Sequence, residues 1–415
     1  MVKYLRSWVL LGLLCPLLEA LEPVAIYLTW VKDPTTTMVV QWQTPTGTTL
    51  PQLEYQIKGD STWKSAKGHS QIVQEYDVHR IYLEGLTEDN VYLFKVQDSK
   101  REYSFQTMPK KLTRSVKMAI GGDAYHAGAS EIFHRMNRMI AFNHPDFIVI
   151  GGDLAYTIGT KNLLKGPKWA MARWQAFLRS LQRTIGQGGG QDGRLIPLLP
   201  LVGNHDVNKL KDKTDKPELF YEIFTFPEVG KAYRSLDFGD YFSLVMLDTG
   251  HTWPVEGDQT VWLENTLKTK QPFPYLLAAY HVAAYPSYYP YTEGNAVNIR
   301  KNWVPLFEKY QVPFAFEHHN HTYKRTHPIK EGKVDPSGVT YLGDGSWGVH
   351  TRPVDTLKKT WYLEKSGSIN CCYIVTLSPE KCLIEAKNSQ GEVIDQISKP
   401  PFWVDFIEDG TRFSR

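Results

Sequence analysis

Cysteine is scarce in this sequence, long apolar runs are missing after the first twenty residues, and neither sign of charge forms a block. Four cysteines in 415 residues exclude a small scaffold held together by disulfides. The formal net charge is only +3, with charges mixed along the chain, so nucleic acid and acidic membranes are not expected as specific partners. With 42% hydrophobic residues, the chain can instead bury the cores of two or three domains.

The cysteines leave little scope for disulfides. If residues 1–20 are removed, Cys371, Cys372 and Cys382 remain, and an odd number allows at most one internal disulfide. Cys372 and Cys382 could pair across the hairpin expected at 378–381. A simple two-residue turn would instead place Cys382 opposite Leu377. We therefore favour buried free thiols.

Residues 1–20 have the layout of a secretory signal peptide. Lys3 and Arg6 precede an apolar run over 8–14, and the segment ends at Leu18-Glu19-Ala20. The run is too short to span a bilayer comfortably, although an uncleaved N-terminal anchor is the alternative.

Short strands separated by turn residues are predicted over 21–109. We expect them at 24–30, 37–42, 53–58, 79–83, 91–96 and 102–107. Six short strands in a segment of this length indicate an all-β sandwich of the fibronectin type III or immunoglobulin kind. No pattern of catalytic residues stands out in it.

From residue 110 to about 400, apolar runs alternate with segments of helical spacing. We expect strands at 116–120, 147–150, 196–202, 275–279 and 312–316, and helices at 129–142 and 167–185. This alternation predicts an α/β domain, followed by a C-terminal tail at 401–415. In such domains ligands commonly bind at the carboxyl ends of the strands.

Five polar blocks follow the apolar runs of the predicted α/β domain. They are Gly122-Asp123, Gly152-Asp153-Leu154-Ala155-Tyr156, Gly203-Asn204-His205-Asp206, Tyr280-His281 and His318-His319-Asn320-His321. Each block alone could be a turn or a satisfied core histidine. Together they supply two carboxylates, a phenol, an amide and three imidazoles, which is the inventory of a two-metal hydrolytic centre.

These blocks, in this order, resemble those of the purple acid phosphatases in the calcineurin-like metallophosphatase superfamily. The family pattern reads GDxx, GDxxY, GNH[DE], a strand ending in His, and GHxH. The resemblance covers most of residues 22–350. It implies an α/β metallophosphatase sandwich, in which helices flank two mixed β-sheets, preceded by the all-β domain.

The resemblance also implies how seven ligands divide between two metals. Asp123, Tyr156 and His321 would bind one metal, Asn204, His281 and His319 would bind the second, and Asp153 would bridge both. Two carboxylates and a phenolate are hard anionic ligands that suit Fe(III), whereas amide and imidazole ligands suit a divalent ion such as Zn, Fe or Mn. A packed tyrosine with a satisfied hydroxyl is the alternative for Tyr156.

The implied activity is that of an acid phosphatase, a metal-dependent phosphoric monoester hydrolase acting on small phosphate esters. Hydroxide on the dinuclear Fe(III)–M(II) centre would attack phosphorus in line. His205 is the candidate to stabilise the phosphoryl oxygens or protonate the leaving alcohol, with Asp206 either orienting it or capping a turn. The alternatives are a phosphodiesterase on the same centre and a non-catalytic binding or adhesion protein with a relic metal site.

Three departures from the family pattern affect proton transfer and substrate choice. Tyr125 and His318 stand where many members have Gly, and the segment after His281 lacks the outer histidines of plant-type members. We hypothesise that His126 or His318 partly fills the role of proton donor, although ordinary hydrogen bonding beside the ligands is the alternative. Four tyrosines follow His281 and could line the substrate mouth or pack against the sandwich: Tyr285, Tyr288, Tyr289 and Tyr291.

The only Asn-x-Ser/Thr acceptor is Asn320-His321-Thr322, inside the proposed site, where a glycan would block access. With the signal-like N-terminus, this favours a secreted or periplasmic protein, of bacterial rather than heavily glycosylated eukaryotic type. The sequence leaves the physiological ester, the divalent metal and the oligomeric state open.

Overall fold

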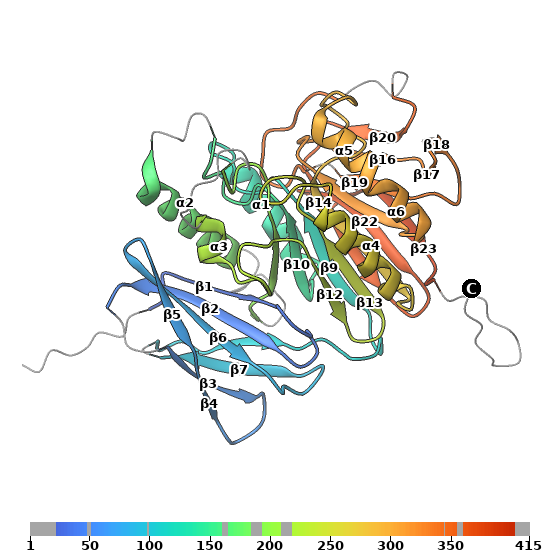
Figure 1. Ribbon diagram of the computed structural model, residues 1–415. Helices are drawn as coiled ribbons and strands as arrows, with labels where there is room; N and C mark the ends of the chain where they lie inside the picture. Colours follow the sequence, from blue (N-terminus) through green and yellow to red (C-terminus); the bar gives the residue numbers. More distant parts are fainter. Residues whose placement is uncertain are drawn as a thin grey trace, which may run out of the picture.

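The computed structural model describes residues 22–47, 51–97, 99–159, 165–183, 193–208, 218–343, 345–354 and 360–402. The predicted signal peptide and all but the first two residues of the predicted tail lie outside these ranges. Figure 1 shows a β-sandwich, coloured blue, packed beneath a larger α/β part. No helix among the described residues is long and apolar enough to cross a membrane.

The N-terminal part consists of two four-stranded antiparallel sheets, as the all-β prediction requires. One sheet has the order β1 (Ala25–Thr29), β2 (Met38–Pro45), β6 (Tyr76–Leu83) and β5 (His69–Val73). The other has the order β4 (Lys64–Lys67), β3 (Gln52–Ile57), β7 (Val91–Val96) and β8 (Tyr103–Gln106). Strands β4 and β5 were not predicted, because their residues are mostly polar and exposed.

Two mixed sheets form the centre of the α/β part. The six-stranded sheet runs β11 (Leu198–Leu201), β10 (Phe147–Gly151), β9 (Val116–Gly121), β21 (Cys371–Leu377), β22 (Cys382–Asn388) and β23 (Val393–Lys399). The seven-stranded sheet runs β12 (Arg234–Phe238), β13 (Phe242–Met246), β14 (Tyr275–Val282), β15 (Phe314–His318), β19 (Thr340–Gly343), β16 (Tyr323–Thr326) and β20 (Leu363–Gly367). A small hairpin is formed by β17 (Ile329–Lys330) and β18 (Lys333–Val334).

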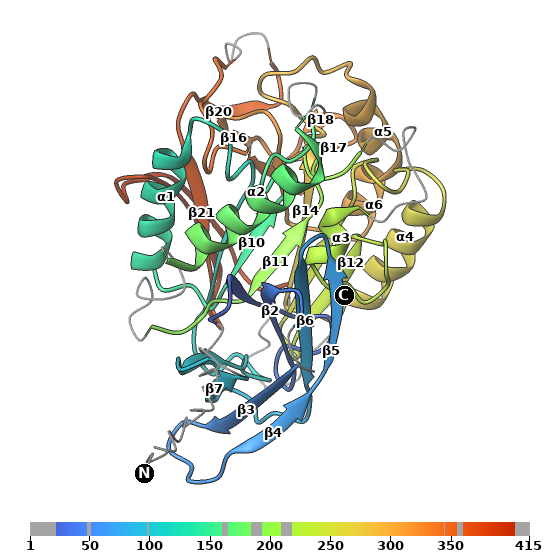
Figure 2. The same ribbon diagram turned by 90° about the vertical axis from the view of Figure 1, so that its left-hand side faces the viewer.

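Helices cover the outer face of each sheet (Figures 1 and 2). Beside the six-stranded sheet lie α1 (Ser130–Phe142), α2 (Gly166–Leu181) and α3 (Leu219–Ile223), and beside the seven-stranded sheet lie α4 (Asp258–Lys270), α5 (Gly294–Asn302) and α6 (Val304–Lys309). Strand alternation separates the layers: Val149 joins the core between the sheets, whereas Ile148 and Ile150 join the core under α1 and α2. The predicted sandwich of two sheets flanked by helices is confirmed.

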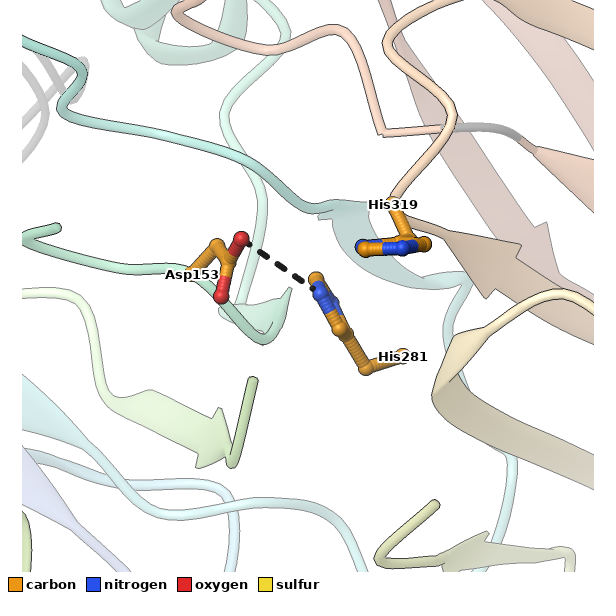
Figure 3. A group of neighbouring side chains, drawn as sticks. All are labelled: Asp153, His281 and His319. Atoms are coloured by element: carbon orange, nitrogen blue, oxygen red, sulfur yellow. Dashed lines mark ion pairs between the residues drawn. The ribbon is translucent and has the colours of Figure 1, made fainter. Parts of the chain in front are cut away.

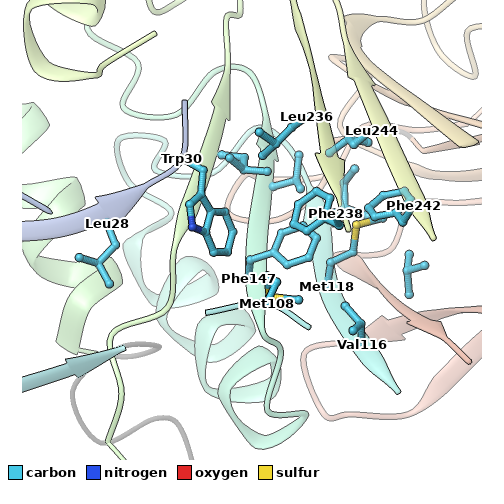
Figure 4. Packing of buried hydrophobic residues seen from close by; sticks show 14 of the residues in the cluster. Leu28, Trp30, Met108, Val116, Met118, Phe147, Leu236, Phe238, Phe242 and Leu244 are labelled. Atoms are coloured by element: carbon cyan, nitrogen blue, oxygen red, sulfur yellow. The ribbon is translucent and has the colours of Figure 1, made fainter. Parts of the chain in front are cut away.

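The N-terminal sandwich shares its hydrophobic core with the α/β part. Trp30 is fully buried, and its ring meets the rings of Phe147 and Phe238 edge-on, with centroids 5.8 Å apart in both pairs (Figure 4). Phe147 and Val116 are the first residues of their parallel strands β10 and β9. The sandwich therefore packs against the amino ends of these strands, opposite the edge where the polar blocks lie.

The register of the β21–β22 hairpin shows whether Cys372 and Cys382 face each other. Leu377 pairs with Cys382, and Cys372 lies opposite Lys387. Cys371, Cys372 and Cys382 are all buried free thiols. The predicted register and the preference for free thiols are confirmed.

Candidate metal centre

The carboxyl ends of strands from both sheets bring the predicted ligands together. Asp123, Asp153 and Asn204 follow β9, β10 and β11 of the six-stranded sheet, which are parallel to one another. His319 follows β15 of the seven-stranded sheet, and His281 is the second-to-last residue of β14. The register between β14 and β15 shifts between Ala279 and Val282, which is the kind of bulge that re-aims a side chain beside an active site.

Asp123, Tyr156 and His321 form one compact group. The Tyr156 hydroxyl donates to Asp123 Oδ1 at 2.9 Å and lies 3.2 Å from His321 Nε2. His321 Nε2 is itself 2.9 Å from Asp123 Oδ1. The structure thus brings together the three residues that the sequence assigns to the first metal.

Asp153, Asn204, His281 and His319 form the adjoining group. His281 Nε2 lies 3.1 Å from Asn204 Oδ1 and 3.5 Å from Asp153 Oδ2. Ligand atoms of Asp153, His281 and His319 all lie within 4.8 Å of one another, and Figure 3 shows these three side chains converging. Nδ1 of His281 donates to the Gly151 carbonyl at 2.8 Å, which fixes the ring and leaves Nε2 for a ligand.

The backbone at this centre is strained. Five of the seven predicted ligands have φ between 53° and 78°: Asp123, Asp153, Tyr156, His319 and His321. Residues other than glycine rarely adopt this left-handed region, at a cost of order 1–3 kcal/mol each. Such strain clusters at functional sites, where the surrounding structure holds residues in backbone conformations that they would not adopt by themselves.

The electrostatics of the centre favour cations. Burial opposes ionisation of Asp123, but His321 holds the pKa of its carboxyl below the ordinary value. Burial also opposes protonation of His281, yet the neighbouring Asp153 carboxylate raises the pKa of His281 to about 10. Burial and the Asp123 carboxylate raise the pKa of the Tyr156 phenol well above its ordinary value, so a phenolate there requires a strong positive charge beside it.

The donor set fits two metal ions. Asp153 Oδ2 is buried and accepts no hydrogen bond among the residues that the structure describes; its polar neighbour is His281 Nε2 at 3.5 Å, and a bound cation would supply the closer partner that a buried carboxylate requires. The separations of 2.9, 2.9 and 3.2 Å within the first group match the roughly 3 Å between adjacent ligands on an ion with bonds of about 2.1 Å. Asp153 is the carboxylate that the family resemblance assigns to both ions, and in the structure it contacts His281 of the second group.

His205 lies beside the centre with one ring nitrogen committed. Its backbone N–H donates to Asp153 Oδ1 at 2.7 Å, and its ring stacks on Tyr156 with centroids 4.9 Å apart. The ring pairs through Nδ1 with the Ile158 carbonyl at 2.7 Å. Because a carbonyl only accepts, Nδ1 carries a hydrogen and Nε2 is the nitrogen that can face a substrate.

Of the two roles considered for Asp206, the contacts favour the cap over an orienting contact with His205. Its two carboxylate oxygens accept the backbone N–H groups of Leu154 at 2.9 Å and Gly203 at 3.0 Å, and only 1% of the residue is exposed. No hydrogen bond joins the Asp206 and His205 side chains in the described part of the chain. Asp206 therefore joins the two ligand-bearing loops, and the Ile158 carbonyl orients His205.

The structure contradicts the prediction that His318 is a proton donor. Its ring is buried between Gly122 and Gly151, and a Cβ atom on Gly151 would lie 1.9 Å from the ring. Burial lowers the pKa of His318 to about 3, and neither ring nitrogen has a hydrogen-bond partner in the described part of the chain. A neutral ring enclosed beneath the ligand loops cannot reach a leaving group. The half-buried His126, whose ring meets Tyr156 edge-on at 4.8 Å, keeps the candidate role.

His251 belongs to the site but was missed in the sequence. It is buried, with its ring 5.5 Å from that of His281, and its Nε2 lies 3.0 Å from Thr249 Oγ1. The signal was present: the segment Leu247-Asp248-Thr249 follows β13, which is parallel to β14. Polar residues at the carboxyl end of this further strand are the sequence signal for His251.

The tyrosine segment after His281 lies against the centre and not on the N-terminal sandwich. Tyr289 stacks on His319 with centroids 4.8 Å apart and an interplanar angle of 22°. Tyr285 and Tyr291 instead pack on Tyr362, with ring centroids 5.4 Å away in both cases. The acceptor Asn320 is fully buried, so its side chain is enclosed in the fold.

Family models match both parts of the chain. Residues 23–107 match the model described as "Purple acid Phosphatase, N-terminal domain", and residues 116–323 match "Calcineurin-like phosphoesterase". The second match alone spans half of the chain.

Curated relatives with similar sequences come from Arabidopsis thaliana. Purple acid phosphatase 15 is 25% identical over 68% of this chain and 58% of its own length, and purple acid phosphatase 23 is 27% identical over 65% and 62%. "Probable inactive purple acid phosphatase 1" is 23% identical over 77% of this chain and 57% of its own length. The chain thus spans less than two thirds of the length of these relatives.

Solved structures share the fold. A purple acid phosphatase from yellow lupin (Lupinus luteus) seeds superposes with a TM-score of 0.74 at 18% identity, covering 91% of this chain and 74% of the lupin chain. PhoD superposes with a TM-score of 0.64 at 10% identity, covering 92% and 89%. At these identities the likeness concerns the fold alone.

Proposed function

Because the chain belongs to the purple acid phosphatases of the calcineurin-like phosphoesterase family, we propose that it hydrolyses phosphate monoesters at a dinuclear metal centre. One observation carries this proposal. The Tyr156 hydroxyl lies within hydrogen-bonding distance of both Asp123 and His321, beside a second group of metal-competent side chains. A phenol in this position suits a trivalent ion and an acidic working pH.

The ligand groups differ in hardness, which supports a mixed pair of metals. Asp123, Tyr156 and His321 would hold Fe(III), and Asn204, His281 and His319 would hold a divalent ion such as Zn, Fe or Mn, with Asp153 shared. When bound, the ions would neutralise phosphate oxygens and make a nucleophile available from water at acidic pH.

His205 is suited to proton transfer in this reaction. Its Nδ1–H is held by the Ile158 carbonyl, so a protonated ring presents Nε2–H to the leaving oxygen. The stacked Tyr156 ring and the backbone bond to Asp153 hold the imidazole in place. Asp206 supports this geometry indirectly through the loop that it joins.

We expect His205→Ala to lower kcat by about 10²- to 10⁴-fold, because a positioned general acid contributes that much. The pH–rate profile should lose the limb assigned to the acid, while the metal content stays at the wild-type level. His126→Ala is the comparison variant, since His126 is the other candidate donor and its ring meets that of Tyr156 edge-on. A larger loss in His126→Ala than in His205→Ala would transfer the role of acid to His126.

Two other functions use the same residues. A phosphodiesterase would need no different ligand. A non-catalytic protein is the second candidate, because a relative bears the name "Probable inactive purple acid phosphatase 1". The presence of all seven predicted ligands in this chain, gathered into two groups, favours catalysis.

A single assay separates the three functions. Turnover of an aryl phosphate and of the corresponding bis-aryl phosphate is measured on the purified protein, before and after metal removal. We expect the monoester to be hydrolysed faster, with both activities lost on chelation and restored by iron plus a divalent ion. Preference for the diester would identify a phosphodiesterase, and no turnover of either ester by the metal-loaded protein would identify the non-catalytic protein. Turnover that is unaffected by chelation would contradict the metal-dependent mechanism.

The proposed enzyme has domain limits near 21–109 and 110–400, which the end of β8 at Gln106 and the start of β9 at Val116 support. Export is proposed from the signal-like residues 1–20 alone. N-terminal sequencing of the mature protein would test it.

A further inference from the structure

The segment Ser287 to Tyr289 is fixed to the loop that carries two predicted ligands. The buried Asn320 Oδ1 accepts the backbone N–H groups of Tyr288 at 3.0 Å and Tyr289 at 2.9 Å. The hydroxyls of Ser287 and Thr322 lie 2.5 Å apart. The backbone of Tyr288 and Tyr289 therefore has a defined position relative to His319 and His321.

Arg352 extends this arrangement outward from the centre. Its backbone N–H donates to the His321 carbonyl at 3.0 Å, and Nη1 donates to the His319 carbonyl at 3.4 Å. Its guanidinium lies 4.9 Å from the Tyr289 ring centroid and 5.1 Å from that of Tyr288. Contacts thus run from His319 through the Tyr289 ring to a cation.

The guanidinium of Arg352 is held by ring contacts but makes few hydrogen bonds within the described part of the protein. Of its five N–H donors, one makes a long hydrogen bond, and no carboxylate among the described residues forms an ion pair with it. Arg300 offers a contrast: its guanidinium lies 3.6 Å over the Tyr291 ring and donates to the carbonyls of Ala284 and Tyr291. Aromatic contacts hold the Arg352 group while leaving its donors for an external oxyanion.

We propose that Arg352 is a specificity-determining residue that binds an anionic group on the leaving alcohol of the substrate. This inference rests on the proposed phosphatase function. Tyr289 contacts both the imidazole of the predicted ligand His319 and the Arg352 guanidinium, which also donates to the His319 carbonyl, so the cation lies at the edge of the proposed centre, where it can meet a group carried by the leaving alcohol. A carboxylate or a second phosphate presents the oxygen pair that a guanidinium binds through two N–H donors. The preferred substrates are therefore monoesters with a charged leaving group.

A matched pair of esters tests this assignment. The esters are 4-carboxyphenyl phosphate and 4-carbamoylphenyl phosphate, which differ in one charge at nearly constant shape. We expect the wild-type kcat/KM ratio to favour the carboxyl ester by about tenfold relative to Arg352→Gln, through a lower KM, as for one charge-assisted hydrogen bond. Comparing ratios between variants cancels the intrinsic reactivity of the two leaving groups. Arg352→Lys should keep part of the preference, because it retains a point charge without the planar fork.

Arg300→Gln is the control, because it removes a stacked arginine from the same tyrosine segment whose donors are already used. Its ratio should equal that of the wild type. An unchanged ratio in Arg352→Gln, or an equal loss in Arg300→Gln, would overturn the assignment.

Binding of non-hydrolysable analogues separates this inference from the proposed function. Calorimetry on the metal-loaded protein compares 4-carboxybenzylphosphonate with 4-carbamoylbenzylphosphonate, in which a methylene replaces the ester oxygen. Tighter binding of the carboxyl analogue to wild type, but not to Arg352→Gln, supports the role of Arg352 even if neither ester is turned over. Equal Kd values in the wild type count against Arg352, whereas lack of turnover alone counts against the phosphatase proposal.

Discussion

Replacing Asp153 by Asn is expected to lower kcat/KM for an aryl phosphate by at least about 10³-fold and to reduce the metal content below two ions per chain. Asp153 is the carboxylate proposed to serve both ions, and its buried Oδ2 makes no hydrogen bond in the described part of the protein, with His281 Nε2 3.5 Å away. An amide of the same size removes the negative charge that two cations would share. Metal ions are worth several kcal/mol to the transition state of such reactions, which corresponds to this loss in rate.

Tyr156→Phe is the matched variant for Asp153→Asn, because it removes one ligand atom from the first group and leaves the second group intact. We expect a broad visible absorption band in the wild type, from an Fe(III)–phenolate pair, and its loss in Tyr156→Phe. Metal analysis, visible spectra and steady-state rates of the three proteins provide the check. A colourless wild type that holds only divalent ions and turns over esters normally would keep the fold and refute the iron assignment. Two ions and full activity in Asp153→Asn would refute the bridging role.

Replacing Lys324 by Met is expected to destabilise the protein by about 3–5 kcal/mol, because it leaves a buried carboxylate without its counter-charge. The Lys324 and Glu317 side chains are both fully buried and form an ion pair. Glu317 Oε1 also accepts the Tyr280 hydroxyl at 2.6 Å and the Ala284 backbone N–H at 2.7 Å. These bonds fix the two sides of His281, so we also expect weaker metal binding in the variant.

Chemical denaturation of the wild type and the Lys324 variants measures the effect. The double variant Lys324→Met/Glu317→Gln should recover part of the loss, because the unpaired charge is then removed as well. Lys309→Met is the control: its partner Glu264 is 2.6 Å away, but both side chains are largely exposed, and a change there should be small. Equal destabilisation by the exposed and the buried substitution would contradict the argument.

Several features of the fold follow from local patterns that survive in any context. Apolar runs predicted β9, β10 and β15 within a few residues, because buried parallel strands have nearly continuous apolar sequences. The hairpin register opposite Cys382 followed from turn length alone. By contrast, β4 and β5 could not be predicted from periodicity, because their exposed polar residues form strands only through pairing with neighbouring strands.

The order and spacing of the five polar blocks determined the family, the fold class and the identity of the seven candidate ligands, because those properties depend on residue types at strand ends. The tertiary structure decided which side chains meet. It enclosed His318 between two glycines, turned Asp206 toward backbone N–H groups, and brought His251 and Arg352 beside the centre from segments that carry no motif. The physical reason is that a side chain's role depends on its burial and on partners distant in sequence. Periodicity and spacing record only the neighbours along the chain.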